Sequence, residues 1–302
     1  MRPVAEAEAM AALFDRLDHQ RPATCGAYVL AYLFPALGLR SHEGHDLSAE
    51  DYLAHLAAVV VEADEVGPSE AVGREVAAGH LSEQDALHAY GRIWYRYPVR
   101  SSADPVEAGT SPSGVMRAVA LGSSGDLTTL PIAARLDDGT IQLTEDRWSA
   151  LLAELAANTD TWAWHAVLNY ETDRLLKPDD PAYSPDGLRT WGPDSGVPLD
   201  DWGVGHFVGL AGLWRRQGDG AWWLLLFDTY KDRGFSGYEP QPAALMRDGL
   251  IRADGRGGGI ILIVPRDQLS AVSTAVVRLG LTPGVWRNGS PEPDDWTWEL
   301  GR

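Results

Sequence analysis

Hydrophobic and polar positions follow two different periods along the chain, and the change between them divides it near residue 125. In the first part, apolar residues recur every three or four positions, which is the spacing of amphipathic helices. Polar residues that favour helix starts, or a proline, precede several of these runs. The helices expected from this pattern cover residues 5–18, 25–38, 48–62, 67–79, 82–94 and 111–121.

The later part contains shorter apolar runs of the length and residue types typical of strands, together with three more helical segments. An Asp-Gly pair at 138–139 predicts a tight hairpin turn between two of these runs. The expected strands, one of them in the first part, cover residues 94–100, 130–136, 140–143, 163–170, 203–214, 221–230 and 259–264. The expected helices cover residues 144–158, 242–249 and 266–279.

This succession predicts an α+β fold in a single domain over residues 1–302. A helical part would span residues 1–125 and a sheet-rich part residues 126–302, with insertions around residues 40–200. A chain of this length can bury a sizeable core, because the fraction of surface removed from water rises with size.

Charge and composition narrow the class of protein. The net charge of −18 argues against nucleic acid or an anionic membrane as a partner, because both require basic patches. Glu6 and Glu8 stand where a signal peptide needs an apolar core, and no apolar run reaches the roughly 18 residues of a membrane span. We therefore expect a cytoplasmic protein. The abundance of Ala, Gly, Asp and Arg is typical of GC-rich bacterial coding.

Cys25 is the only cysteine, which excludes an intramolecular disulfide and a zinc site built on cysteines. A polar turn containing Gln20 leads directly into the apolar helix that begins at Cys25. The backbone N–H groups and dipole of a helix N-terminus favour a thiolate. Cys25 is therefore a candidate nucleophile. The alternative is that it acts as a small buried apolar residue.

The histidines outside this stretch do not form a convincing site. His42 and His45 lie in a Gly- and Ser-containing segment that reads as a solvated loop without a third ligand nearby, so we predict neither a metal nor a cofactor. His165 lies within an apolar strand, which favours a core position over a catalytic one.

His206 and Asp228 are brought together by a predicted hairpin. His206 begins one strand, Asp228 ends the next, and the turn between them is centred near Gly218. In an antiparallel hairpin these two ends lie side by side. The carboxylate can then orient the imidazole, which is the arrangement that a thiol nucleophile needs in its base.

Residues 177–203 form an unusually long connection, rich in Pro and Asp, that leads into His206. Connections of this length are commonly lids, binding loops or disordered linkers. Trp191 and Trp202 favour a loop that contacts substrate over a disordered one, and Gly205 follows where the strand begins. We therefore assign Trp191, Trp202 and Gly205 to substrate binding.

Three short motifs, in this order, resemble the papain-like cysteine peptidases, and most closely the bacteriocin-processing peptidases that remove double-glycine leaders and their stand-alone relatives. The motifs are Gln20 followed by Cys25-Gly26, then His206-Phe207-Val208-Gly209-Leu210, and then Phe227-Asp228-Thr229. They cover about sixty residues of the chain. Thr229 replaces the proline that is common in the family, Thr24 replaces an acidic residue, and the spacing between Cys25 and His206 is longer.

The resemblance implies a papain-like fold and a Cys25–His206–Asp228 triad, with Gln20 and the Cys25 backbone N–H as an oxyanion hole. It implies a peptidase, amide hydrolase or acyltransferase that forms an acyl-enzyme on a peptide or a small amide or thioester, in bacterial peptide or natural-product biosynthesis. The fold does not separate these reactions. The alternative is a catalytically inactive domain of the same fold that binds a peptide or a partner protein.

Overall fold

The computed structural model describes residues 2–3, 6–17, 20–90, 94–176, 204–230 and 237–299. Helices and a large sheet make up these residues, which confirms the predicted α+β class. The helices are α1 (Ala7–Phe14), α2 (Cys25–Ala36), α3 (Glu50–Leu56), α4 (Ala63–Ala77), α5 (Glu83–Tyr90), α6 (Pro112–Gly122), α7 (Glu145–Ala157), α9 (Ala243–Ile251) and α10 (Leu269–Arg278). The first six of these lie before residue 125.

The large sheet has seven strands, and every pairing within it is antiparallel. Its strands are β1 (Arg2–Pro3), β6 (Leu127–Ala133), β7 (His165–Glu171), β8 (Gly205–Arg215), β9 (Trp222–Phe227), β10 (Tyr238–Pro242) and β11 (Gly259–Pro265). They follow the order β10-β9-β8-β7-β11-β6, and β1 pairs with β8. Two small pairs lie outside this sheet: β2 (Ser41–His42) with β3 (His45–Asp46), and β4 (Val60–Glu62) with β5 (Arg100–Ser102).

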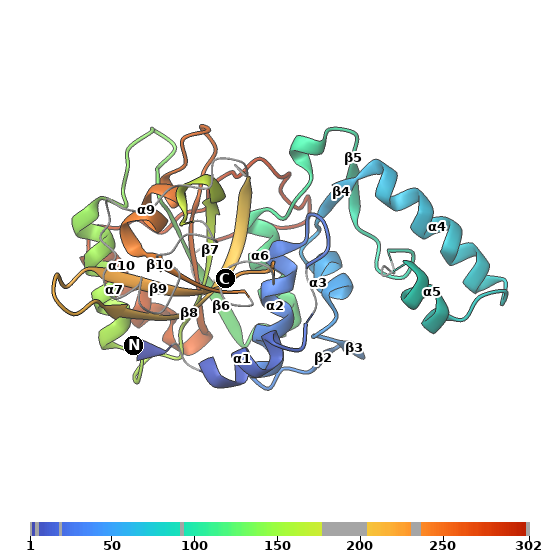
Figure 1. Cartoon of the computed structure of the whole chain (residues 1–302), viewed down its shortest axis with the longest axis horizontal. Helices are drawn as coiled ribbons and strands as arrows, with labels where there is room; N and C mark the ends of the chain where they lie inside the picture. Colours follow the sequence, from blue (N-terminus) through green and yellow to red (C-terminus); the bar gives the residue numbers. More distant parts are fainter. Residues whose placement is uncertain are drawn as a thin grey trace.

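Helices cover both faces of the sheet. Figure 1 shows α1, α2 and α6 on one side and α7, α9 and α10 on the other. A strand between two helical layers is shielded from water on both faces, so it needs apolar residues at successive positions rather than alternate ones. The run Ile260–Val264 in β11 has this pattern, and all five side chains are buried. The same run was predicted to be a buried strand.

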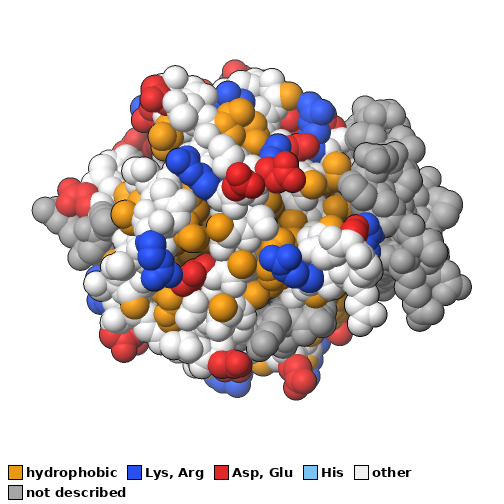
Figure 2. Space-filling model, turned by 90° about the vertical axis from the view of Figure 1, so that its left-hand side faces the viewer, with side chains coloured by type: hydrophobic (Ala, Val, Ile, Leu, Met, Phe, Trp, Pro, Cys, Tyr) orange, Lys and Arg blue, Asp and Glu red, His pale blue; other side chains and the backbone are white. Residues whose placement is uncertain are grey.

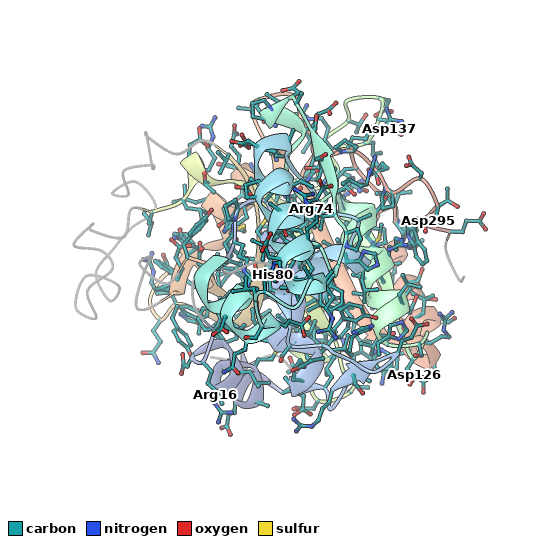
Figure 3. All side chains as sticks on the ribbon, turned by 90° about the vertical axis from the view of Figure 1, so that its right-hand side faces the viewer. Arg16, Arg74, His80, Asp126, Asp137 and Asp295 are labelled. Carbon is teal, nitrogen blue, oxygen red and sulfur yellow. The ribbon has the colours of Figure 1, made fainter. Side chains whose placement is uncertain are left out.

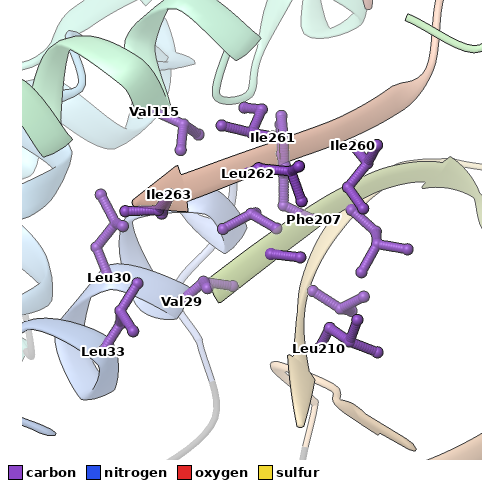
Figure 4. Packing of buried hydrophobic residues seen from close by; sticks show 14 of the residues in the cluster. Val29, Leu30, Leu33, Val115, Phe207, Leu210, Ile260, Ile261, Leu262 and Ile263 are labelled. Carbon is purple, nitrogen blue, oxygen red and sulfur yellow. The ribbon is translucent and has the colours of Figure 1, made fainter. Parts of the chain in front are cut away.

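Helix α2 lies at the centre of the protein. All eleven residues Cys25–Pro35 are buried, and a helix that is apolar all round belongs in a core. Val29, Leu30 and Leu33 belong to the same buried cluster as Leu210 of β8 and Ile263 of β11 (Figure 4). Cys25 therefore begins a helix that is buried in the core.

An aromatic cluster joins α1, α2 and β9. The Phe14 ring stacks on Phe227 with 4.8 Å between centroids, and Tyr32 contacts both rings edge-on at 5.5 and 5.6 Å. Tyr32 also lies directly against Gly209 of β8, where a Cβ atom would overlap its hydroxyl oxygen. Gly209 therefore allows β8 to approach α2 closely.

A helical arm formed by α4 and α5 projects from the sheet-containing body (Figure 1). Figure 3 views this arm end-on, with Arg74 of α4 and His80 of the following turn labelled. Within α4, Ser69 and Val72 are buried, while most of its other side chains are exposed or half-buried. The opposite face of the molecule, beyond α7 and α10, carries interspersed acidic, basic and apolar side chains (Figure 2).

Two predictions from the first part were wrong in extent. The helix expected over residues 48–62 ends at Leu56, and Val60–Glu62 form the strand β4. Three consecutive valines, which favour strands, outweigh the helical pattern before them. The edge strand expected over residues 94–100 is reduced to β5, which begins at Arg100 and runs parallel to β4.

The hairpin predicted over residues 130–143 was also wrong. The Asp-Gly turn forms, but across it the strands share a single bridge, between Arg135 and Ile141. β6 pairs over its full length with β11, more than a hundred residues away. A buried strand that is shielded on both faces offers more apolar contact than the short segment 140–143.

No helix in the described parts of the chain combines the length and apolar composition that crossing a membrane requires.

We predict that Gly209→Ala destabilises the protein by about 1–3 kcal/mol, because the added methyl group must displace Tyr32 or separate β8 from α2. Urea unfolding followed by tryptophan fluorescence measures this change. Gly284→Ala is the matched control, since a Cβ there meets nothing within 4 Å, and it should change the free energy of unfolding by less than about 0.5 kcal/mol. Equal stability of the two variants would contradict the close approach of β8 and α2.

Candidate active site

Cys25 is the first residue of α2, as predicted, and it is 7% exposed. Thr24 precedes it but does not cap the helix. Its hydroxyl instead donates to the carbonyl oxygen of Arg21, at 2.7 Å, and to Glu50. Because the hydroxyl is engaged elsewhere, it leaves the N–H groups of the first turn of α2 for other acceptors.

Glu50 of α3 fixes the turn that leads into Cys25. One carboxylate oxygen accepts hydrogen bonds from the Arg21 backbone N–H, at 2.9 Å, and from the Thr24 hydroxyl. Burial raises the pKa of Glu50, and the hydrogen bonds from Thr24 and Arg21 partly oppose this rise. The sequence analysis did not identify Glu50, which in the chain is one of several acidic residues at a helix start.

His206 and Asp228 meet at the end of the β8–β9 hairpin. The register pairs Gly209 with Phe227, so His206 near the start of β8 and Asp228 just after β9 are brought to the same end. The Nε2 atom of His206 lies 3.3 Å from Oδ1 of Asp228, and both side chains are at most 3% exposed. The predicted juxtaposition of these two residues is confirmed.

The environment of His206 favours its charged form. Burial alone would lower the pKa of His206, but the charge of Asp228, its hydrogen bond and a further hydrogen bond with Cys25 raise the pKa to about 9. At neutral pH the ring therefore carries two protons. Since Nε2 faces Asp228, Nδ1 is the nitrogen left to exchange a proton with the thiol.

Thr229 and Tyr230 complete the surroundings of the imidazole. The Thr229 hydroxyl lies 3.1 Å from His206 Nε2 and donates to the side-chain oxygen of Gln20. The Tyr230 ring stacks on His206 with 5.4 Å between centroids, and its hydroxyl accepts a hydrogen bond of 3.1 Å from Gln20 Nε2. The Tyr230 backbone N–H also donates to Asp228 Oδ1, at 2.8 Å.

The side chain of Gln20 is thus held at both ends of its amide, by Thr229 and Tyr230. The backbone N–H of Gln20 donates to the Thr229 carbonyl oxygen at 3.1 Å. The stretch before Cys25 is in this way joined by hydrogen bonds to the stretch after Asp228. Thr229, which replaces the proline of the resembling peptidases, supplies the hydroxyl for this link.

A cavity of about 440 Å³ opens beside these groups. Gln20, Cys25, Gly205 and His206 all line it, so the structure brings four of the predicted site residues to one space, with Asp228 behind His206. Three other cavities in the described parts of the chain are lined by neither a cysteine nor a histidine.

The predicted substrate-binding residues Trp191 and Trp202, and the connection 177–203 that contains them, lie outside the described residues.

His165 lies in the core of β7, where burial lowers its pKa to about 4. At the β2–β3 hairpin, His42 stacks on Tyr52 and the His45 ring packs against Tyr52 at a tilt. In the described ranges, no three His, Cys, Asp or Glu side chains are grouped so that they could hold a metal ion.

The cavity also contains charged residues that the sequence analysis missed. Arg252, Asp254 and Arg256 follow α9 and line the wall next to Gly205. In the sequence they form an ordinary charged turn, and only the packing of α9 against β7 brings them to the site. Tyr230 was likewise missed, although it directly follows the predicted strand that carries Asp228.

The geometry can be set beside known proteins in two comparisons. None of the curated proteins is significantly similar in sequence. The model of a family of unknown function, DUF6885, matches residues 4–287, which include all of the site residues described above. Because this match spans nearly the entire chain, the protein belongs to the DUF6885 family.

Proposed function

We propose that this protein is a cysteine-dependent acyl-transfer enzyme, a peptidase or amide hydrolase or an acyltransferase, with Cys25 as its nucleophile. The observation that carries the proposal is the position of His206, buried between the Cys25 thiol and the Asp228 carboxylate and charged at neutral pH. A nucleophile, a base and a group that orients the base form the minimum set for covalent catalysis of this kind.

In the first step, the Cys25 sulfur attacks the carbonyl carbon of the substrate, and the carbonyl π electrons move to the oxygen. The tetrahedral intermediate then collapses, and the bond from carbon to the leaving group breaks. The leaving group takes its proton from His206, whose charge Asp228 has stabilised until then. The product of this step is a thioester on Cys25.

In the second step, neutral His206 removes a proton from water or from another nucleophile, which attacks the thioester. The carbon–sulfur bond breaks and the Cys25 sulfur leaves with the electron pair, next to a His206 that is charged again. If water attacks the thioester, the reaction is a hydrolysis, and if an amine or thiol attacks, it is an acyl transfer. Bonds form and break and protons move in the same order in both reactions.

The oxyanion of both steps needs two donors. Gln20 lines the cavity, and Tyr230 takes one of the two N–H bonds of its amide nitrogen, which leaves the other for a substrate oxygen. The second donor is the backbone N–H of Cys25. It lies at the N-terminus of α2, which the side chain of Thr24 does not cap. Losing one such donor typically costs about 2.7–4 kcal/mol of transition-state stabilisation.

The arrangement of these residues also supports a papain-like fold. The nucleophile begins a central helix, and the histidine and aspartate follow on neighbouring antiparallel strands, in the order in which the resembling peptidases carry them. The alternative is a non-catalytic domain that binds a peptide or a partner protein. The low exposure of Cys25, 7%, is the observation that favours it.

We predict that iodoacetamide alkylates Cys25 of the native chain at neutral pH, and that His206→Ala slows this reaction on the order of a hundredfold, because the thiolate loses its charged partner. Mass spectrometry counts the adduct, and Cys25→Ala, which should fold normally, is the blank. An inert thiol in the native chain, or one that reacts equally fast without His206, would favour the binding domain.

A second prediction concerns Asp228→Asn, which removes the charge that raises the pKa of His206. The titration midpoint of His206 should fall from about 9 toward lower pH, so the alkaline limb of any activity profile moves down in the same direction. Two-dimensional ¹H–¹⁵N NMR of the imidazole groups measures the midpoint. His206→Ala assigns the signal, and His165, with a pKa of about 4, is an internal reference that the substitution should not move. An unchanged midpoint would show that Asp228 does not stabilise the imidazolium.

A third prediction separates the oxyanion hole from the nucleophile. Gln20→Ala should slow acylation of Cys25 by p-nitrophenyl acetate by about a hundredfold or more, because an oxyanion forms in that reaction. Alkylation by iodoacetamide involves no oxyanion and should stay within about twofold of the native rate. Equal slowing of both reactions would indicate that Gln20 only supports the structure around Thr229 and Tyr230.

A further inference from the structure

We infer that the substrate carries a carboxylate close to the carbonyl attacked by Cys25, and that Arg252 binds this carboxylate. The inference rests on the proposed acyl-transfer function and specifies the class of its substrate. It depends on the wall of the cavity that follows α9, where Arg252 lies next to the strand that begins at Gly205.

Two of the three nitrogen atoms of the Arg252 guanidinium have a hydrogen-bond partner, and the third has none among the described residues. Nε and Nη2 donate to the two carboxylate oxygens of Asp254 at 3.0 and 2.5 Å, which is the bidentate geometry that arginine favours. The side chain is 1% exposed, and Nη1 has no hydrogen-bond partner among the described residues. A buried donor without a partner is costly, so an acceptor supplied by a ligand would be bound strongly.

The Nη1 atom belongs to a residue that lines the same cavity as His206 and Cys25. It lies against Gly205, where any side chain would overlap it, and Gly205 directly precedes His206. Arg252, Gly205, His206 and Cys25 line the same cavity. An acceptor on Nη1 and a carbonyl placed over Cys25 would therefore occupy the same cavity.

The charge balance of this wall favours an anion. Arg256 approaches the same Asp254 carboxylate, at 3.8 Å, so two arginines share one acidic residue. Burial works against ionisation of Asp254, but the hydrogen bonds from Arg252 and Arg256 hold its pKa below the ordinary value, so the pair keeps its full charge. Among the described residues, these two arginines and Asp254 leave one positive charge uncompensated on this wall, in a protein whose net charge is −18.

Among the described residues, a further carboxylate close to this wall, that of Glu171, is already engaged. Glu171 accepts a hydrogen bond from the Ala253 backbone N–H at 2.9 Å and lies 3.9 Å from Arg174, and it does not line the cavity. The remaining polar side chains of the cavity beside this wall, Asn288 and Ser290, are neutral. A carboxylate is the substrate group that fits this combination, because it accepts hydrogen bonds and complements the positive charge.

Two reagents of nearly equal size test the inference, since both alkylate the single cysteine: iodoacetate carries a carboxylate and iodoacetamide does not. In Arg252→Gln, we expect the rate with iodoacetate to fall on the order of tenfold and the rate with iodoacetamide to stay within about twofold. The charged His206 also attracts iodoacetate, so the decisive quantity is the change caused by the substitution and not the preference of the native protein.

Arg247→Gln is the matched control, because Arg247 lies on α9 and pairs with Asp248 but does not line the cavity. Both of its rates should stay within about twofold of the native rates. An equal fall of both rates in Arg252→Gln, or no fall of either, would overturn the inference. If iodoacetamide failed to label the native thiol, the proposed acyl-transfer function itself would be contradicted, which is a different result.

Protection experiments on the native chain decide the question if Arg252→Gln does not fold. N-acetylglycine should slow alkylation of Cys25 by iodoacetamide, while N-acetylglycinamide at the same concentration should not. N-acetyl-aspartic acid α-amide, whose carboxylate is on the side chain, identifies the source of the group. Protection by N-acetylglycine would indicate that the substrate carboxylate is a C-terminal one. Protection by the aspartate derivative would indicate that it belongs to an acidic side chain. Protection by neither acid would contradict the inference.

Discussion

A buried charge on His206 is the constraint on which the site depends. Placing a cation in a buried position is unfavourable, and here Asp228, with a smaller contribution from Cys25, reverses that cost so far that the pKa of the ring rises to about 9. The reversal requires Asp228 to stay within hydrogen-bond reach, which in turn requires the register of β8 and β9. The aromatic cluster around Phe227 and the contact of Gly209 with Tyr32 then fix this hairpin to the helix that carries Cys25.

The parts of the site that the sequence could predict are those set by local rules. The start of α2 follows from a polar turn before an apolar run, and the proximity of His206 and Asp228 follows from counting outward from a hairpin turn. The helix expected from residue 144 is found as α7, and the Thr144 side chain caps it as a threonine at that position should.

What the sequence could not give depends on partners far along the chain. β6 pairs with β11 instead of its neighbour, because pairing with a shielded strand buries more apolar surface than a short hairpin. Arg252 reaches the cavity only because α9 packs on β7, and nothing in its own segment distinguishes it from a surface arginine. Glu50 and Thr229 likewise acquire their roles from contacts across the fold.

The link between Gln20 and Thr229 spans 209 positions of the chain, and this separation has a consequence for biosynthesis. A ribosome adds roughly 5–20 residues per second, so roughly 10–40 seconds pass between the synthesis of Gln20 and that of Thr229. For most of this interval the nascent chain contains Cys25 but neither His206 nor Asp228. Closing so long a loop costs chain entropy, which only the complete sheet can offset. The arrangement of Cys25, His206 and Asp228 is therefore completed only late in synthesis, after the strands that hold it have been made.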